Sequence, residues 1–364
     1  MEETRCLEPD YAADFFCDGA RCGAMCCQRW SVFVDEGTYQ KYQRLPARER
    51  NWLLPRIANG LAEAEDGTGL PVGAVTHCLD FAPDKRCHFL REDKLCGVQR
   101  RLGEEYLGDT CALYPRLIMQ IGGHLERALY LSCPLAAELA LLRDEPLHFT
   151  WRPSPAARHQ DGWVKTATDE GSEGMAEAFW LLQQTGLILL QQTEFPFTER
   201  LARLYAYLSR ADAAVENGDL EALLKLSLAF REKAAQGVPP LPRHEPEWLA
   251  GLQEALAQAE ADNECVTAIP RLETSRPLPP WPLLMENFLT AQFQLGLYPC
   301  RLKGSLAHNA AVFLALADLL EATVRPAWES GDVGATLSAC VRLSILANHD
   351  RNWLHSLSAF LEIR

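Results

Sequence analysis

The sequence predicts a mainly α-helical protein, in which a cysteine-rich N-terminal domain with few short strands is followed by an α-helical C-terminal domain. Three observations support this prediction. Ten of the thirteen cysteines lie at or before Cys133. A proline-containing connector, LLRDEPLHFTWRPSPAARHQDG, then runs from Leu141 to Gly162. Beyond Gly171, apolar residues recur at the spacing of amphipathic helices.

The length of 364 residues indicates two domains or one large one. We place the cysteine-rich domain at residues 1–145 and the helical domain at residues 146–364. Within the first, the apolar runs Ser31–Val34 and Arg127–Ser132 are long enough only for brief strands.

In the second domain, we expect a series of helices separated by proline-containing breaks. Phe179, Leu182, Ile188 and Leu189 lie near one face of the first helix, which is apolar enough to be largely buried. Asp219 is the expected N-cap of a helix that ends before Gly237. The expected helices cover residues 175–192, 197–216, 219–236, 247–261, 283–296, 305–323, 334–347 and 353–363.

The charge pattern excludes several classes of partner. A formal net charge of −14 and the lack of a basic block argue against binding to nucleic acid. The N-terminus, MEETRCLEPDYAADFF, has neither the basic start nor the apolar core of a secretory signal. No stretch approaches the roughly 18 apolar residues of a membrane span. We therefore expect a cytoplasmic protein with reduced thiols and no membrane partner.

Eight cysteines form a dense constellation, beginning with four in the segment FFCDGARCGAMCCQRW. Clustered thiols in a reducing compartment are more typical of metal sites than of disulfides or core packing. Soft thiolates select zinc, copper(I) or iron–sulfur clusters. We therefore expect residues 1–145 to bind metal. The isolated Cys265, Cys300 and Cys340 are interpreted as structural. Cys6 and Cys78 are undecided, with a structural role favoured.

The spacing favours iron–sulfur over zinc without deciding which thiols are ligands. Paired C-x2-C knuckles, the usual zinc spacing, are absent. An iron–sulfur cluster accepts more varied spacing and takes four cysteines as its full set. Adjacent Cys26 and Cys27 would not easily reach one iron, so some of the eight thiols bind a second metal, pair with each other or support the site. His77, His88 and His124 are interpreted as structural residues rather than ligands.

The segments CDGARCGAMCCQRWSVFVDEGTYQKYQRL, CHFLREDKLCGVQRRLGEEYLGDTCALYPR and LSCP together resemble the flagellin lysine N-methylase family. Its members carry a CxxCxxCC domain regarded as zinc- or iron-chelating, and the match extends roughly from Tyr11 to Glu138. His88 stands where family members often have proline, a change in loop rigidity rather than in ligation. The domain also occurs in small proteins without methylase activity.

The resemblance implies a bacterial cytoplasmic enzyme that transfers methyl groups from S-adenosylmethionine to lysine side chains of flagellin and is associated with a [4Fe–4S] cluster. Zinc is the alternative metal. The cysteines that match the family motif, and are thereby implied as metal ligands, are Cys17, Cys22, Cys26, Cys27, Cys87, Cys96, Cys111 and Cys133.

The segment LGEEYLGDTCALYPR carries the candidate catalytic residues. Glu105 and Asp109 are expected to attract a cationic lysine or take its proton, and Tyr114 to hydrogen-bond the amine. Arg116 is the candidate for binding a carboxylate of the cofactor, because guanidinium matches that group with two parallel hydrogen bonds. The structural alternatives are a solvated helix face for Glu105 and its neighbour, and bracing of the cysteine loop by Tyr114 and Arg116.

Neither the G-x-G-x-x-G fingerprint nor the C-x3-C-x2-C spacing of radical S-adenosylmethionine chemistry is present. Direct attack of a neutral lysine amine on the sulfonium methyl group is therefore expected. Two rival functions stay open: a non-catalytic module that stores or senses iron or zinc, and a structural zinc protein that scaffolds other subunits. Metal analysis combined with a test for S-adenosylmethionine binding separates these from the enzyme.

Single Cys→Ser substitutions test the metal interpretation. Cys22→Ser and Cys111→Ser are expected to lose iron, because each removes a thiolate of the constellation, whereas Cys300→Ser is expected to keep it. Iron content and cluster spectroscopy of the anaerobically purified variants measure this. Retention of iron after each of the eight substitutions would refute the metal interpretation.

Overall fold

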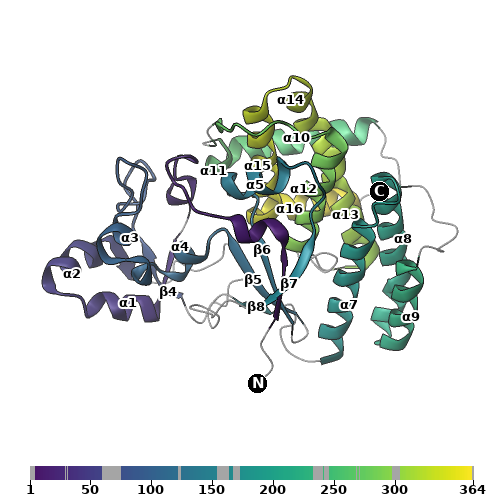
Figure 1. The fold of residues 1–364 in the computed structure, drawn as a ribbon, viewed down its shortest axis with the longest axis horizontal. Coiled ribbons are helices and arrows are strands. Elements are labelled where there is room, and N and C mark those ends of the chain that lie inside the picture. The colour runs from purple at the N-terminus through teal and green to yellow at the C-terminus, as the bar shows by residue number, and fades with distance from the viewer. Residues whose placement is uncertain are drawn as a thin grey trace.

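The computed structural model describes most of the chain, and its helices outnumber its strands (Figure 1). The mainly α-helical class with a few short strands is thereby confirmed. None of the described helices combines the length and apolar character that a membrane span requires. The described residues are 5–28, 30, 32–59, 75–121, 124–153, 164–166, 173–232, 241, 246–267, 269, 271–296 and 304–362.

A five-stranded mixed sheet occupies the middle of the molecule, with the strand order β7-β1-β6-β5-β8 (Figure 1). The central strand β6 pairs in parallel with β1 and antiparallel with β5, while the outer strands β7 and β8 pair with β1 and β5. Strands from both sides of the expected boundary at residue 145 join this sheet. The strands are β1 (Arg5–Pro9), β5 (Arg116–Ile121), β6 (His124–Leu129), β7 (Phe149–Pro153) and β8 (Val164–Thr166).

A small lobe with its own hydrophobic core lies to one side of this sheet (Figure 1). Tyr42, Leu53 and Val98 are buried in that core, and the side chain of Asp35 caps the first helix by accepting from the Thr38 amide at 2.7 Å. A three-stranded antiparallel sheet of order β2-β4-β3 completes the lobe. Its elements are β2 (Phe33–Asp35), α1 (Glu36–Gln43), α2 (Ala47–Leu53), β3 (Ile57–Asn59), β4 (Val75–Leu79), α3 (Gly97–Leu102) and α4 (Asp109–Leu113).

The helices expected in the second half of the chain are confirmed. Asp219 caps its helix by accepting from the Ala222 amide at 2.9 Å, while Gly237 lies outside the described residues. Ile188 is an exception to the expected buried face, because it is exposed on α7. The helices are α5 (Pro134–Leu141), α7 (Glu173–Leu190), α8 (Phe197–Glu216), α9 (Leu220–Arg231), α10 (Pro246–Asp262), α11 (Glu264–Thr267), α12 (Trp281–Leu295), α13 (Leu306–Leu319), α14 (Arg325–Glu329), α15 (Val333–His349) and α16 (Arg351–Glu362).

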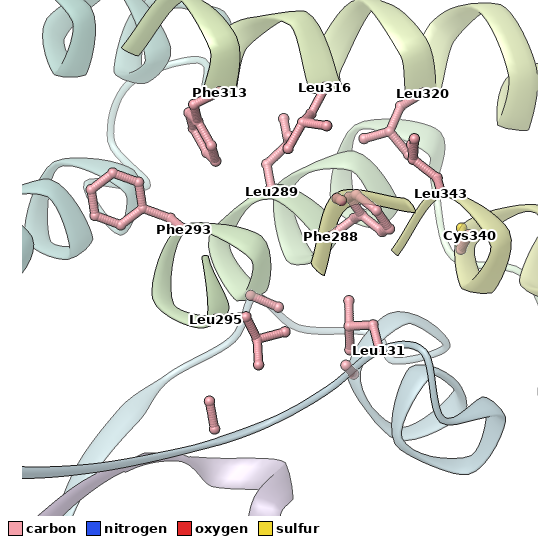
Figure 2. Packing of buried hydrophobic residues seen from close by; sticks show 14 of the residues in the cluster. Leu131, Phe288, Leu289, Phe293, Leu295, Phe313, Leu316, Leu320, Cys340 and Leu343 are labelled. Atoms are coloured by element: carbon pink, nitrogen blue, oxygen red, sulfur yellow. The ribbon is translucent and has the colours of Figure 1, made fainter. Parts of the chain in front are cut away.

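The main hydrophobic core joins these helices to the segment that follows strand β6. Figure 2 shows Phe288 and Phe293 of α12, Phe313 of α13 and Cys340 of α15 packed in this core. Leu131, which comes from the loop after β6, is fully buried in the same cluster. Each such side chain contributes roughly 1.5–3 kcal/mol by burial, so the loop is firmly anchored. Cys340 is structural, as expected.

A buried carboxyl group lies where the sheet meets two of these helices. Glu126 of β6 is completely buried and accepts hydrogen bonds from Nε2 of Gln184 at 2.9 Å and of Gln294 at 3.5 Å. Burial raises its pKa to about 8, although the two amides oppose this shift. Glu8 of β1 is equally buried, but two arginines, Arg127 and Arg152, form ion pairs with it.

The raised pKa of Glu126 predicts a stability that falls as the pH rises. Below about pH 4.5 the Glu126 carboxyl group is protonated in both the folded and the unfolded chain. Between about pH 4.5 and pH 8 only the folded chain keeps this proton. Glu126→Gln cannot ionise and keeps an acceptor for Gln184. We expect this variant to gain stability over the wild type across that window, by about 1.4 kcal/mol for each unit of pKa shift removed.

Urea unfolding at a series of pH values measures this gain. Glu221→Gln, the same change at an exposed position of α9, is the matched control and should leave the pH dependence as in the wild type. A Glu126→Gln curve that runs parallel to that of the control at every pH would show that Glu126 is ionised in the folded protein.

Candidate metal centre

The loop of residues 15–28 carries four of the eight cysteines and is shaped by two residues with left-handed backbone. Gly23 and Ala24 have φ values of 67° and 57°, and the chain then enters the short turn Met25–Cys27. The Gln28 side chain stabilises this reversal by donating from Nε2 to the Gly23 carbonyl at 2.7 Å. The loop thereby folds back on itself, so that cysteines on both sides of the reversal approach one another.

Backbone hydrogen bonds join this loop to the segment that carries the next two cysteines. The Cys87 amide donates to the Cys27 carbonyl at 2.9 Å. Cys96 precedes α3 and forms a β-bridge with Leu90, which closes the turn between the two cysteines. Cys111 lies on α4. These contacts bring residues from separate parts of the small lobe against the loop.

The eighth cysteine reaches the loop from the other side. Cys133 occupies the N-cap position of α5 and is buried. The same helix contacts the loop through Glu138, whose Oε2 accepts from Nη2 of Arg21 at 2.7 Å. Because Leu131 is fixed in the main core, the position of Cys133 depends on the helical part of the molecule.

The structure brings the eight candidate ligands together around Cys26. A negative charge on Cys26 acts on the sulfur atoms of every other member of the set, either electrostatically or through a hydrogen bond. The affected residues are Cys17, Cys22, Cys27, Cys87, Cys96, Cys111 and Cys133.

Around Cys26, the other seven thiols form two groups. Cys22 acts on Cys17 and on Cys133, and we call these three residues the first thiol group. Cys87 and Cys111 act on Cys27, and Cys96 acts on both Cys87 and Cys111. We call these four residues the second thiol group. Cys26 acts on members of both groups, and its thiol is hydrogen-bonded to that of its neighbour Cys27.

Most of these thiols are held in their neutral form by their surroundings. Burial raises the pKa of Cys17 and Cys87 to about 11, and that of Cys111 well above its ordinary value. Cys26 is the exception, because a hydrogen bond from the Cys27 thiol lowers its pKa. Thiolate ligands must lose their protons, so a cation among these sulfur atoms would have to supply the stabilising charge.

Cys17 and Cys111 are both surrounded by protein and in contact with solvent. Each has exposed surface, yet burial is the largest cause of its raised pKa. Both findings hold for a side chain that lies below the general surface and still meets water.

Two findings describe the state of these donors. Each of the twelve described cysteines is a free thiol, which rules out disulfides among them. Within the described part of the chain, no three His, Cys, Asp or Glu side chains are placed to hold a single metal ion. A four-iron cluster would take four thiolates around an inorganic core larger than one ion.

Two predicted site residues lie beside the first thiol group. Tyr114 is within electrostatic reach of Cys22, Cys26 and Cys133, and burial is the main reason why its pKa is raised. Arg116 lies near Cys17 and Cys133 and over the Phe15 ring, 5.0 Å from its centre.

The guanidinium group of Arg116 makes one long hydrogen bond to the neighbouring backbone. Arg116 donates from Nη2 to the Phe15 carbonyl at 3.5 Å, which is long for a hydrogen bond. Burial lowers the pKa of Arg116, and the thiol of Cys17 opposes that shift. A half-buried guanidinium beside the thiols is a suitable partner for an anionic group.

The predicted carboxylates lie in the small lobe. Asp109 is buried at the start of α4, and its amide donates to Oδ2 of Asp35 at 3.3 Å. Glu105 is exposed, and its carboxylate lies over Gly103. Its neighbour Glu104 is also exposed and acts electrostatically on Arg116. The catalytic roles of Asp109 and Glu105 stay predictions.

Two polar residues next to the centre were not identified from the sequence. The Tyr114 hydroxyl is 3.1 Å from Oγ of Ser132, which in turn is 2.8 Å from Nε2 of His349. Ser132 and His349 are 217 positions apart and belong to no recognisable sequence motif. Only the fold brings them together.

The histidines considered as metal ligands have other partners. His77 stacks on Tyr39 with ring centres 3.5 Å apart, and its Nδ1 lies 3.8 Å from Glu36. His88 lies 3.7 Å from Asp80. The side chain of His124 lies outside the described part. These contacts agree with structural roles for His77 and His88.

The chain is similar to proteins of Salmonella. It is 29% identical over 137 residues to the flagellar biosynthetic protein FliU of Salmonella muenchen. The aligned region covers 37% of this chain and 75% of that relative. It is 28% identical over 141 residues to the lysine-N-methylases of Salmonella choleraesuis and Salmonella typhimurium. The aligned region covers 37% of this chain and 32% of each of these relatives. No family model and no solved structure matches the chain.

The match therefore spans about a third of the chain and about a third of the length of the two lysine-N-methylases. The names of these relatives agree with the family indicated by the cysteine motif. These relatives confirm the resemblance of this chain to the flagellin lysine N-methylase family.

Proposed function

We propose that this chain catalyses the transfer of methyl groups from S-adenosylmethionine to lysine side chains of flagellin. A [4Fe–4S] cluster held by four of the eight converging cysteines is part of the proposal. The observation that carries it is the gathering of these thiols around Cys26, beside Tyr114 and Arg116, in a chain that resembles lysine-N-methylases.

The reaction makes two demands on the residues of the site. The lysine amine, with an ordinary pKa of about 10.4, must first lose its proton. Its nitrogen must then approach the methyl carbon opposite the sulfonium, so that the N–C bond forms as the C–S bond breaks. Tyr114 is proposed to accept a hydrogen bond from the ammonium group, and Asp109 to attract it.

Arg116 is proposed to bind the carboxylate of S-adenosylmethionine. Its guanidinium lies beside Cys17 and Cys133 and donates only one long hydrogen bond to Phe15. When bound, the cluster would supply an iron site for the amino and carboxylate groups of the cofactor, so that the thiols and Arg116 would hold one end of that molecule. Glu105, which is exposed in the small lobe, is proposed to attract the lysine-bearing surface.

A second function is favoured by one observation. The match to the lysine-N-methylases covers only about a third of their length. The shared segment is therefore compatible with a non-catalytic iron- or zinc-binding module, in which the helical part binds a partner. Such a module is expected to hold metal and to ignore S-adenosylmethionine.

Transfer of a labelled methyl group tests the proposed function. The anaerobically purified chain is incubated with methyl-labelled S-adenosylmethionine and flagellin from the same bacterium, and label on flagellin lysines is measured by mass spectrometry. We expect label with the wild type. Label that never reaches flagellin, with the cluster intact, would contradict the enzyme and favour the metal module.

Arg116→Gln tests the binding of the cofactor. We expect the KM for S-adenosylmethionine to rise about 10-fold to 100-fold, because a hydrogen bond to a charged group contributes about 1.5–3 kcal/mol. Arg325→Gln, at an exposed arginine of α14 that pairs with Glu321 and Glu329, is the matched control and should leave this KM unchanged. An equal KM in the two variants would remove Arg116 from the cofactor site.

A further inference from the structure

Two consecutive hydrogen bonds lead from Tyr114 to the end of a distant helix. Tyr114 lies beside the first thiol group, and its hydroxyl is 3.1 Å from Oγ of Ser132. Ser132 Oγ lies 2.8 Å from Nε2 of His349. Both distances are short enough for a proton to pass between the groups. The three residues come from three separate segments of the chain.

The middle of this path is enclosed by protein. Ser132 is completely buried, and it follows Leu131, which is fixed in the main core (Figure 2). A buried hydroxyl with two polar partners has a defined orientation, because it can donate to one partner while it accepts from the other. Ser132 can therefore accept from Tyr114 and donate to His349.

The far end of the path is suited to hold a positive charge. His349 is the last residue of α15, a helix of 17 residues, and the C-terminus of a helix favours a cationic side chain. Two aromatic rings flank the imidazole, Trp30 at 5.0 Å and Tyr130 at 4.7 Å between ring centres. His349 is partly exposed, so a proton that reaches it can pass to water.

Three described neighbours of His349 are known from its ring contacts and its hydrogen bond. Trp30 and Tyr130 carry no charge at neutral pH, and Ser132 does not ionise. The nearest acidic residue along the chain is Asp350, whose carboxylate accepts from Nδ2 of Asn263 at 3.1 Å and from the Trp353 amide at 2.9 Å. An anion next to His349 would further stabilise its charged form.

We propose that Tyr114, Ser132 and His349 form a proton relay that neutralises the substrate lysine, with His349 as the final acceptor. This inference rests on the proposed lysine methylation and adds a route for the proton. It explains why a partly buried tyrosine beside the thiols is linked to a histidine in the helical part of the molecule.

The transfer balances without any further reactant. The lysine ammonium gives a proton to the Tyr114 hydroxyl, which passes its own proton to Ser132, and Ser132 passes its proton to Nε2 of neutral His349. A neutral amine, two intact hydroxyls and one imidazolium result. The amine then attacks the methyl group, and the imidazolium releases its proton to water.

Substitution of His349 separates a relay from a structural contact. A glutamine at this position can accept the hydrogen bond from Ser132 but cannot take up a proton at neutral pH. We expect His349→Gln to lower kcat about 100-fold, which is within the usual contribution of general acid–base catalysis. The KM for flagellin and the iron content should stay as in the wild type.

The chain offers a closely matched control. His308 of α13 also bonds a serine through Nε2, at 2.8 Å from Oγ of Ser358 on α16, and this pair is separate from the path described above. His308→Gln therefore removes the same kind of contact elsewhere, and it should leave kcat unchanged. Added imidazole should restore part of the activity of His349→Ala, which would show that this variant is folded.

Three results would overturn the relay. One is a His349→Gln chain that methylates flagellin as fast as His308→Gln does. Another is a failure of imidazole to raise the rate of His349→Ala. The third, a wild-type chain that transfers no label, would overturn the proposed function together with the relay, so that the two failures are distinguishable.

Discussion

The structure depends on one constraint, the gathering of eight thiols around Cys26 without any disulfide among the described cysteines. Burial keeps most of these sulfur atoms neutral, so the protein alone does not gain from bringing them together as thiolates. The loop is instead held by backbone features, namely the left-handed Gly23 and Ala24 and the bond from the Cys87 amide to the Cys27 carbonyl. These backbone contacts help to hold the thiols in place.

The helical part contributes to this arrangement. Leu131 in the main core fixes the loop that carries Ser132 and Cys133, and the ion pair between Arg21 and Glu138 joins the cysteine loop to α5. The five-stranded sheet holds strands from both sides of residue 145, which stays a predicted boundary. Coupling of this kind allows a residue near the C-terminus to act at a centre built by the first third of the chain.

Much of this could be predicted from local sequence, and the rest depended on long-range contacts. Helix periodicity and the Asp219 cap are local signals, so the helices were found within a few residues. The clustered cysteines could be recognised from the sequence alone. The parallel pairing of β1 with β6 could not, because it joins strands more than a hundred positions apart. Ile188 was wrongly expected to be buried, because the apolar pattern of α7 does not reveal which part of its surface is covered. Ser132 and His349 had no local signal.

Mössbauer spectroscopy and sulfide analysis of the anaerobically purified wild type test the central claim most directly. If the proposed [4Fe–4S] cluster is present, we expect about four iron atoms and four inorganic sulfides per chain, with the spectrum of a four-iron cluster. A protein that is colourless under strict anoxia and contains stoichiometric zinc without sulfide would contradict it.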